Sequence, residues 1–342
     1  MLWTLFLLLK AKKGGKVLDS IFLYVEKNGE ITITGLQEGV AETAIEIPET
    51  IDNMPVTEIA EQAFLASPIT AVKIGKNVRE IGELAFGICK KLRSVTWNQK
   101  CDVIPSDCFS ECPNLTKFDF SNVKKIGLYA FYKSGLQEVY LTEKIEILEK
   151  GTFSGCSKLQ FVTWHYQCDV IPADCFFGCS NLMQFDFSGV KKVRERAFSK
   201  SGLKEVCLSE DTEVVSRWAF YECKKLSSVI WNCKCNVIPV ECFVRCSNLT
   251  QFGFSSVKKI EAHAFWDSGL TSVTLNKETE VGRSCFARCN DLKKIEWLSD
   301  KSIEEDIFEG CKNIKEIIIS DNVMDIAVDA FASSPNAEIT FV

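Results

Sequence analysis

Phenylalanine recurs along this chain at a nearly constant spacing, and this period constrains the fold more than any other feature. Successive members lie 21, 22 or 23 residues apart in the set Phe64, Phe86, Phe109, Phe131, Phe153, Phe176, Phe198, Phe220, Phe243, Phe265, Phe286, Phe308 and Phe331. A fixed period of this length predicts a solenoid, in which each repeat forms one short unit stacked on the next. Because one unit cannot bury its apolar side alone, we expect the phenylalanine rings to form a ladder inside the stack.

Each repeat predicts one strand followed by a tighter segment. In the repeat that begins at Leu136, Val139 and Leu141 alternate with polar residues, which is the period of a half-buried strand. Ile145 and Leu148 follow at a wider spacing that favours a short helical or 3₁₀ turn. The unit predicts an α/β repeat fold: a right-handed leucine-rich-repeat solenoid with a concave parallel β-sheet and an irregular or 3₁₀ convex side.

A longer period overlies the short one. Three blocks of three repeats each begin with C-(D/N)-V-I-P and align almost without gaps, over residues 101–167, 168–234 and 235–300. We therefore expect a solenoid of about 12–13 turns over residues 61–342. Residues 20–60 are expected to form an N-terminal cap, because Asn28-Gly29 between two apolar runs predicts a β-hairpin.

The first residues, 1–19, differ from the rest. Leu2–Leu9 is apolar apart from Thr4, but it is far shorter than the roughly 20 residues that span a bilayer. The segment lacks the basic start and the small-residue cleavage site of a signal peptide. The sequence leaves open a degenerate signal, an anchor or a mis-started N-terminus, and no other stretch predicts a transmembrane span.

The repeats resemble BspA-type leucine-rich repeats from about residue 45 to the C-terminus. The resemblance is carried by Ile47–Phe64, Ile81–Leu92 (I-G-E-L-A-F-G-I-C-K-K-L) and Phe153–Leu159 (F-S-G-C-S-K-L). Most repeats depart from the family pattern by having W-N, W-H, F-S or L-S in place of Ile-Pro after the strand. The resemblance implies a secreted or cell-surface antigen that serves adhesion or recognition and binds host matrix proteins or other cells. An intracellular, cytoplasmic scaffold with reduced cysteines is the alternative.

Composition and motifs argue against several other functions. The net charge of −6 and the pI near 5.3 do not favour a nucleic-acid partner. The two histidines, His165 and His263, have no nucleophile within reach in the expected stack, and no nucleotide, hydrolase or metalloprotease motif is present. We therefore expect a non-catalytic protein with no cofactor and with a protein partner, and the sequence indicates no oligomeric state.

The 17 cysteines follow the repeat. Cys108, Cys175, Cys242 and Cys285 lie directly before a ladder phenylalanine, where a small buried residue is expected. Three residues after the phenylalanine, cysteines occur in adjacent repeats about 5 Å apart, which suits disulfides Cys89–Cys112, Cys156–Cys179, Cys223–Cys246 and Cys289–Cys311. Cysteine and serine also alternate there with the form of the following loop, which explains the pattern without oxidation. The C-x(3)-C spacing lacks a second pair, so no metal site is expected.

The outward strand positions are the candidate binding surface, and most of them are small and polar. Two adjacent repeats differ by carrying Tyr140 and Phe161, although block duplication should have copied them. Exposed aromatic residues beside polar groups are typical of protein-contact hot spots, while the strand propensity of aromatic residues is the alternative. The candidate binding residues are Tyr140, Phe161, Thr163, His165, Tyr166, Asp119 and Asp186.

Overall fold

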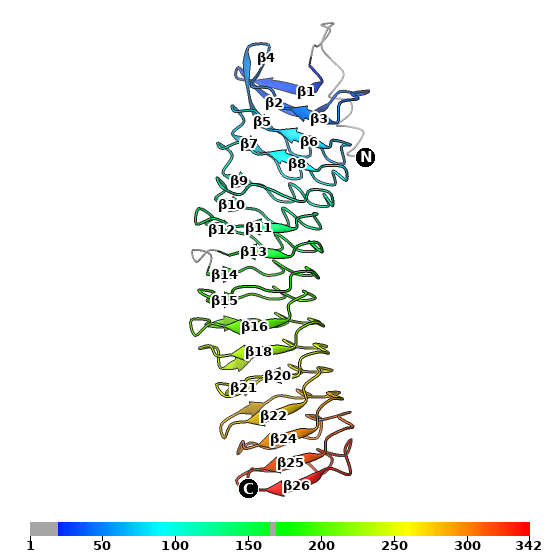
Figure 1. The fold of residues 1–342 in the computed structure, drawn as a ribbon. Coiled ribbons are helices and arrows are strands. Elements are labelled where there is room, and N and C mark those ends of the chain that lie inside the picture. Colours follow the sequence, from blue (N-terminus) through cyan, green and yellow to red (C-terminus); the bar gives the residue numbers. More distant parts are fainter. Residues whose placement is uncertain (1–19, 165–168) are drawn as a thin grey trace.

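The protein is a long stack of similar turns, running from an N-terminal hairpin to a C-terminal strand (Figure 1). The computed structural model describes residues 20–164 and 169–342. The predicted segment 1–19, and also His165 and Tyr166, lie outside the described residues. Within those two ranges the chain forms strands and turns and no helix, and so none that is long and apolar enough to cross a membrane.

Most turns contribute to one or both of two ladders of parallel strands. The first ladder carries the strands that the sequence predicts: β3 (Ala44–Glu46), β6 (Ala71–Lys73), β8 (Ser94–Thr96), β11 (Glu138–Tyr140), β13 (Phe161–Thr163), β16 (Glu205–Leu208), β18 (Ser228–Trp231), β20 (Gln251–Phe252), β22 (Ser272–Leu275), β24 (Lys294–Trp297), β25 (Glu316–Ile319) and β26 (Glu338–Phe341). Neighbouring strands pair in parallel within four separate sheets of this ladder. We call the side of the stack that this ladder covers the strand side.

The second ladder was not predicted. It contains β5 (Met54–Ile59), β7 (Glu80–Ile81), β9 (Val103–Ile104), β10 (Lys125–Ile126), β12 (Ile147–Leu148), β14 (Val170–Ile171), β15 (Lys192–Val193), β17 (Val214–Val215), β19 (Val237–Ile238), β21 (Lys259–Ile260) and β23 (Glu280–Val281). These short strands also pair in parallel, for example Ile126 with Leu148. Many turns therefore have two extended segments, because apolar residues such as Ile126 pack inward while their backbone bonds to the turn on either side.

An antiparallel hairpin of β1 (Phe22–Lys27) and β2 (Glu30–Leu36) lies at the N-terminal end. Asn28 and Gly29 both have positive φ, 54° and 77°, as a tight primed turn requires. Strand β2 pairs in parallel with β5, and β4 (Thr50–Ile51) pairs with β5 in the antiparallel sense. The predicted hairpin is thus present, whereas the role of residues 20–60 as a cap stays a prediction.

The phenylalanine ladder is present as predicted. All neighbouring members of the set are stacked, with ring centroids 5.3–5.8 Å apart and ring planes within 4–24° of each other. The rings from Phe64 to Phe308 are buried. Tryptophans from the strand side, such as Trp231 against Phe243, pack edge-on against the ladder at 5.8 Å. The core is therefore a continuous aromatic column with indole rings beside it.

The segment around each ladder phenylalanine is not the expected 3₁₀ helix. The amides of the phenylalanine itself and of the residues two before and two after it mostly donate to carbonyl oxygens of the next turn. The amides between them close turns within the segment. Around Phe131 the first set is Tyr129, Phe131 and Lys133, and the second is Ala130, Tyr132 and Ser134. Tyr129 and Lys133 are left-handed, with φ of 50° and 52°. A 3₁₀ helix needs every amide to bond three residues back, so the expected α/β class and 3₁₀ convex side are not confirmed. We call the side of the stack that these phenylalanine segments cover the turn side.

Candidate binding surfaces

The strand side carries the aromatic pair that the sequence singles out. Strands β11 and β13 are adjacent and parallel, with Glu138 opposite Phe161 and Tyr140 opposite Thr163. Residues two apart on a strand point to the same face, so these four side chains form one outward group. The side chains of Tyr140 and Phe161 are 57% and 60% exposed. We call Glu138, Tyr140, Phe161 and Thr163 the strand-side patch.

The polar part of the strand-side patch is arranged along one strand. The Tyr140 hydroxyl donates to Glu138 Oε2 at 3.0 Å. This hydrogen bond to a carboxylate raises the pKa of Tyr140, so the phenol stays protonated and neutral at physiological pH. The patch therefore offers two aromatic rings, one carboxylate and one hydroxyl from Thr163. It contains the flat apolar area and the flanking polar groups that protein contacts use.

Asp119 and Asp186 are placed differently from the prediction. Both are exposed, but neither lies on a strand. Each carboxylate accepts a hydrogen bond from a backbone amide two residues on, Asp119 from Ser121 and Asp186 from Ser188, both at 2.9 Å. Such local bonds from Asp compete with ladder hydrogen bonds, and these two repeats have no strand at this position. The two aspartates are exposed as expected but do not lie on a strand, and their part in binding stays a prediction.

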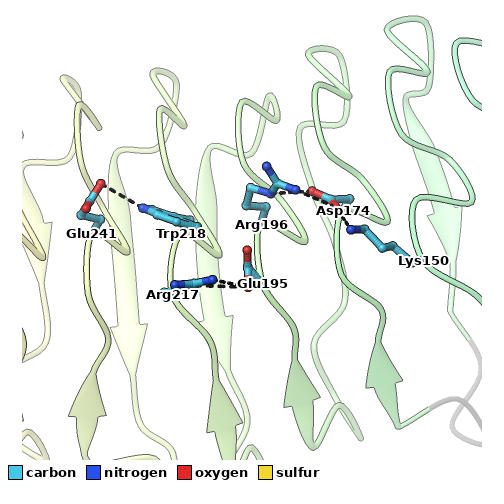
Figure 2. A network of polar contacts seen from close by, with 7 residues as sticks. All are labelled: Lys150, Asp174, Glu195, Arg196, Arg217, Trp218 and Glu241. Carbon is cyan, nitrogen blue, oxygen red and sulfur yellow. Dashed lines mark hydrogen bonds and ion pairs between the residues drawn. The ribbon is translucent and has the colours of Figure 1, made fainter.

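A network of charged and aromatic side chains crosses several turns on the turn side, and the sequence analysis missed it (Figure 2). The Arg196 guanidinium makes two contacts with Asp174, Nε to Oδ1 at 2.8 Å and an amino group to Oδ2 at 3.1 Å. Lys150 Nζ lies 3.3 Å from the same carboxylate, whose side chain is only 7% exposed. Arg217 pairs with Glu195 at 3.2 Å in the neighbouring turns.

The same network includes an indole. Trp218 Nε1 donates to Glu241 Oε2 at 2.9 Å, and the Arg217 guanidinium lies 4.4 Å from the Trp218 ring centroid. The sequence contains a signal for these contacts. Residues two positions before successive ladder phenylalanines lie in one column, and this column contains Tyr129, Gly151, Asp174, Arg196, Trp218 and Glu241. Opposite charges in adjacent members of such a column predict contact between turns.

A shallow hollow of about 370 Å³ lies beside this network. It is lined by Asp107, Tyr129, Tyr132, Ser154, Asp174, Phe177 and Arg196. Gly151 shapes it, because a Cβ at this left-handed position would lie 2.1 Å from Cε1 of Tyr129. The missing side chain lets the tyrosine ring lie across the next turn. The hollow is open, and Asp174 and Arg196 in its lining already pair with each other, so its chemistry suits structure more than ligand capture.

The cysteines that follow the ladder phenylalanines have a structural contact in common. Each thiol donates to the carbonyl oxygen of the ladder phenylalanine in the turn before, at 3.0–3.2 Å, for Cys89, Cys112, Cys156, Cys179, Cys223, Cys246, Cys289 and Cys311. Burial raises the pKa of Cys89 and of Cys156 to about 12. These thiols are free in the structure, and this contact gives each one a role as a thiol. The four predicted disulfides stay predictions.

The remaining candidate residues are scattered along the stack. Cys108, Cys175, Cys242 and Cys285 are fully buried beside the ladder, as predicted for small core residues. His263 lies on the turn side, where its backbone amide donates to the Arg283 carbonyl oxygen at 3.0 Å. Over residues 20–164 and 169–342, no three His, Cys, Asp or Glu residues are grouped so that they could hold a metal ion.

The stacked turns, the parallel strands and the aromatic column define the protein as a leucine-rich-repeat solenoid. The family model of the BspA type leucine rich repeat region (6 copies) matches residues 57–183, 169–293 and 279–342. The chain therefore belongs to the BspA-type leucine-rich-repeat family, whose repeats are typical of protein-interaction modules, and no catalytic family is indicated.

Two solved structures resemble the protein over nearly its whole length. A leucine-rich repeat protein from Bacteroides ovatus is 21% identical with a TM-score of 0.62, and the match covers 94% of this chain and 98% of that chain. A leucine rich cell surface protein from Faecalibacterium prausnitzii is 21% identical with a TM-score of 0.55, and the match covers 97% and 96%. At this identity the likeness concerns the fold. A search of curated proteins finds no match.

Proposed function

We propose that the protein is a non-catalytic recognition module that binds another protein through the strand-side patch. The observation that carries the proposal is the exposure of Tyr140 and Phe161, 57% and 60%, on adjacent paired strands. Aromatic rings gain most when a partner removes them from water, and tyrosine is enriched among the residues that dominate binding energy. The rest of the first ladder presents mainly small or polar side chains outward, so this pair is the clearest anchor on that side.

We also propose that the protein acts at the cell surface or after secretion, as an adhesion or recognition protein. The family and the cell-surface relative from Faecalibacterium prausnitzii support this location. In this setting the partner is a host matrix protein or a protein on another cell. The acidic net charge of −6 fits a protein partner better than a nucleic acid.

An intracellular scaffold is the second candidate, and the thiol contacts favour it. Each of the thiols after a ladder phenylalanine donates to a backbone carbonyl oxygen, and oxidation to a disulfide would remove that donor. The two candidates differ in a quantity that can be counted. Alkylation of the denatured native protein, followed by mass measurement, gives four bridged pairs for an extracellular protein and 17 free thiols for an intracellular one.

Binding through the strand-side patch can be tested on an array of purified extracellular-matrix and cell-surface proteins. The double variant Tyr140→Ala, Phe161→Ala should lose at least about tenfold in affinity for any protein that the wild type captures, because each ring belongs to the expected anchor. Ile230→Ala is the matched control, since Ile230 is 56% exposed on β18 but lies outside the patch. Equal affinity of wild type and double variant would reject the patch as the binding site.

A further inference from the structure

A pair of cysteines in the loop between β18 and β19 lies at the edge of the core and outside the strand-side patch. Cys233 and Cys235 flank Lys234, and the Cys233 thiol donates to the Cys235 carbonyl oxygen at 3.3 Å. Trp231 fixes the loop, because its Nε1 donates to the Cys235 carbonyl oxygen at 2.7 Å. The Cys235 side chain is partly exposed, whereas Cys233 is 9% exposed. The loop thus holds two neighbouring thiols, of which Cys235 is the more exposed.

The geometry permits a bond between the two sulfurs. Residues two apart are separated by at most about 7 Å between Cα atoms in an extended chain. The chain bends at Cys233 and Lys234, which shortens this separation toward the Cα range that a disulfide requires. The predicted pair Cys289 and Cys311 is fully buried. The pair in this loop differs because Cys235 is partly exposed.

The chain contains its own comparison for this loop. Where the first block begins, Trp97 Nε1 donates to the Cys101 carbonyl oxygen at the same 2.7 Å, but Gln99 occupies the position that corresponds to Cys233. Cys101 is buried, which raises its pKa to about 12. The pKa of Cys235 is instead lowered, to about 6, mainly because of the neighbouring Cys233 side chain, and Cys235 is partly exposed. The Cys235 thiol is therefore the more reactive of the two equivalent cysteines.

The charged groups around the pair are few. Lys234 lies between the two cysteines, and its Nζ is 3.7 Å from Asp211. Glu261 is the nearby acid that opposes ionisation of Cys235. The Cys235 thiol donates to the Val237 carbonyl oxygen at 3.2 Å. The presence of Cys233 is therefore the feature that separates this loop from its copy.

We propose that Cys233 and Cys235 form a thiol–disulfide exchange site whose substrate is a disulfide. The Cys235 thiolate attacks one sulfur of the substrate disulfide, whose S–S bond breaks, and the other sulfur leaves as a thiolate that takes a proton from water. The Cys233 thiol then loses its proton to water, and its sulfur attacks Cys235 in the mixed disulfide and displaces the second substrate thiolate. Overall, the two cysteines lose two electrons and two protons, and the substrate becomes two thiols.

Oxidised glutathione is the probe for the test, with the reduced full chain at pH 7 and with Cys207→Ser as background to remove the exposed thiol on β16. The expected product has lost two hydrogen atoms and carries no glutathione. Trypsin cleaves after Lys234, so the two resulting peptides should stay joined until a reductant is added. In Cys233→Ser the mixed disulfide at Cys235 should persist, because the resolving thiol is gone.

Two variants separate exchange from general reactivity. Cys235→Ser should slow the reaction at this loop by roughly tenfold or more, because the reactive thiolate is missing. Cys101→Ser alters the equivalent position of the first block and should leave the rate unchanged. Unchanged denaturation midpoints confirm that each variant is folded. Peptides that separate without reductant after treatment with excess oxidised glutathione, or glutathione that remains bound when both cysteines are present, would overturn the proposal.

Discussion

The turn side and the strand side of the stack use their polar and aromatic residues in opposite ways. On the turn side, charged groups pair between adjacent turns, as Asp174 does with Arg196 at 2.8 Å. On the strand side, Tyr140 and Phe161 are more than half exposed, and the Tyr140 hydroxyl bonds within its own strand. Contacts repeated along the turn side therefore hold the stack together. On the strand side, residues that differ from the repeat stay available for contact with a partner.

The largest expected effect is that of alkaline pH on the thiols of the turn side. The pKa of most of them is raised by burial in the folded state, to about 12 for Cys89 and Cys156, above the unfolded value of about 8.5. These thiols therefore contribute their full share to the free energy of unfolding below about pH 8.5. That contribution falls as the pH rises toward 12, by about 1.4 kcal/mol per pH unit for each thiol with a raised pKa. The midpoint of urea unfolding, measured under reductant, should be much lower at pH 10 than at pH 8.

Cys156→Ser supplies the control for that pH dependence. The serine hydroxyl can donate to the Phe131 carbonyl oxygen as the thiol does, at 3.1 Å in the wild type, but it does not ionise in this range. The variant should lose less stability between pH 8 and 10 than the wild type. Equal losses in both proteins would mean that the buried thiols do not govern alkaline unfolding.

The next prediction compares a Phe→Ala substitution in the buried ladder with one on the strand side. Phe198→Ala removes a fully buried ring that stacks on Phe176 and Phe220 at 5.3 and 5.8 Å, and it should cost about 3–5 kcal/mol in the free energy of unfolding. Phe161→Ala removes a ring that is 60% exposed and should change stability by less than about 0.5 kcal/mol. Urea denaturation of both variants measures the difference. Similar costs would erase the distinction between the sides.

Asp174→Asn should destabilise by about 1–3 kcal/mol, because Arg196 and Lys150 lose the carboxylate that they share. The control is Asp211→Asn, whose carboxylate pairs with Lys234 at 3.7 Å with both side chains about two-thirds exposed. An exposed pair of this kind contributes less than about 1 kcal/mol. If both variants show the same denaturation midpoint, the turn-side network does not stabilise the stack.

A smaller effect is expected at Gly151. Its φ of 67° disfavours any side chain, and a Cβ would displace the Tyr129 ring from a position 2.1 Å away. Gly178 has a φ of 71°, but the nearest atom to its Cβ would be 3.8 Å away. Gly178→Ala should therefore cost about 1–2 kcal/mol from backbone strain alone, and Gly151→Ala should cost more. Thermal unfolding of the two variants tests whether turn-side crowding adds to the strain.

Much of the fold could be predicted, because the spacing of Phe64 to Phe331 leaves few alternatives to a stacked column. The exposure of Tyr140 and Phe161 followed from strand periodicity. The second ladder could not be predicted in this way, since two-residue strands such as β10 exist only through bonds to neighbouring turns. The lack of a strand at Asp119 and Asp186 depends on a local competition between side chain and ladder. The turn-side network needed the turns to be aligned in space before opposite charges could be matched.

The bond from each thiol to the phenylalanine carbonyl of the preceding turn has a consequence for biogenesis. A thiol such as Cys246 is hidden only when its own turn has settled on the one that holds Phe220. During synthesis these sulfurs are therefore open to any oxidant that the nascent chain meets, whereas an oxidant that arrives after assembly finds them shielded. The timing of oxidant exposure, and not only its strength, should decide how much of this protein matures correctly.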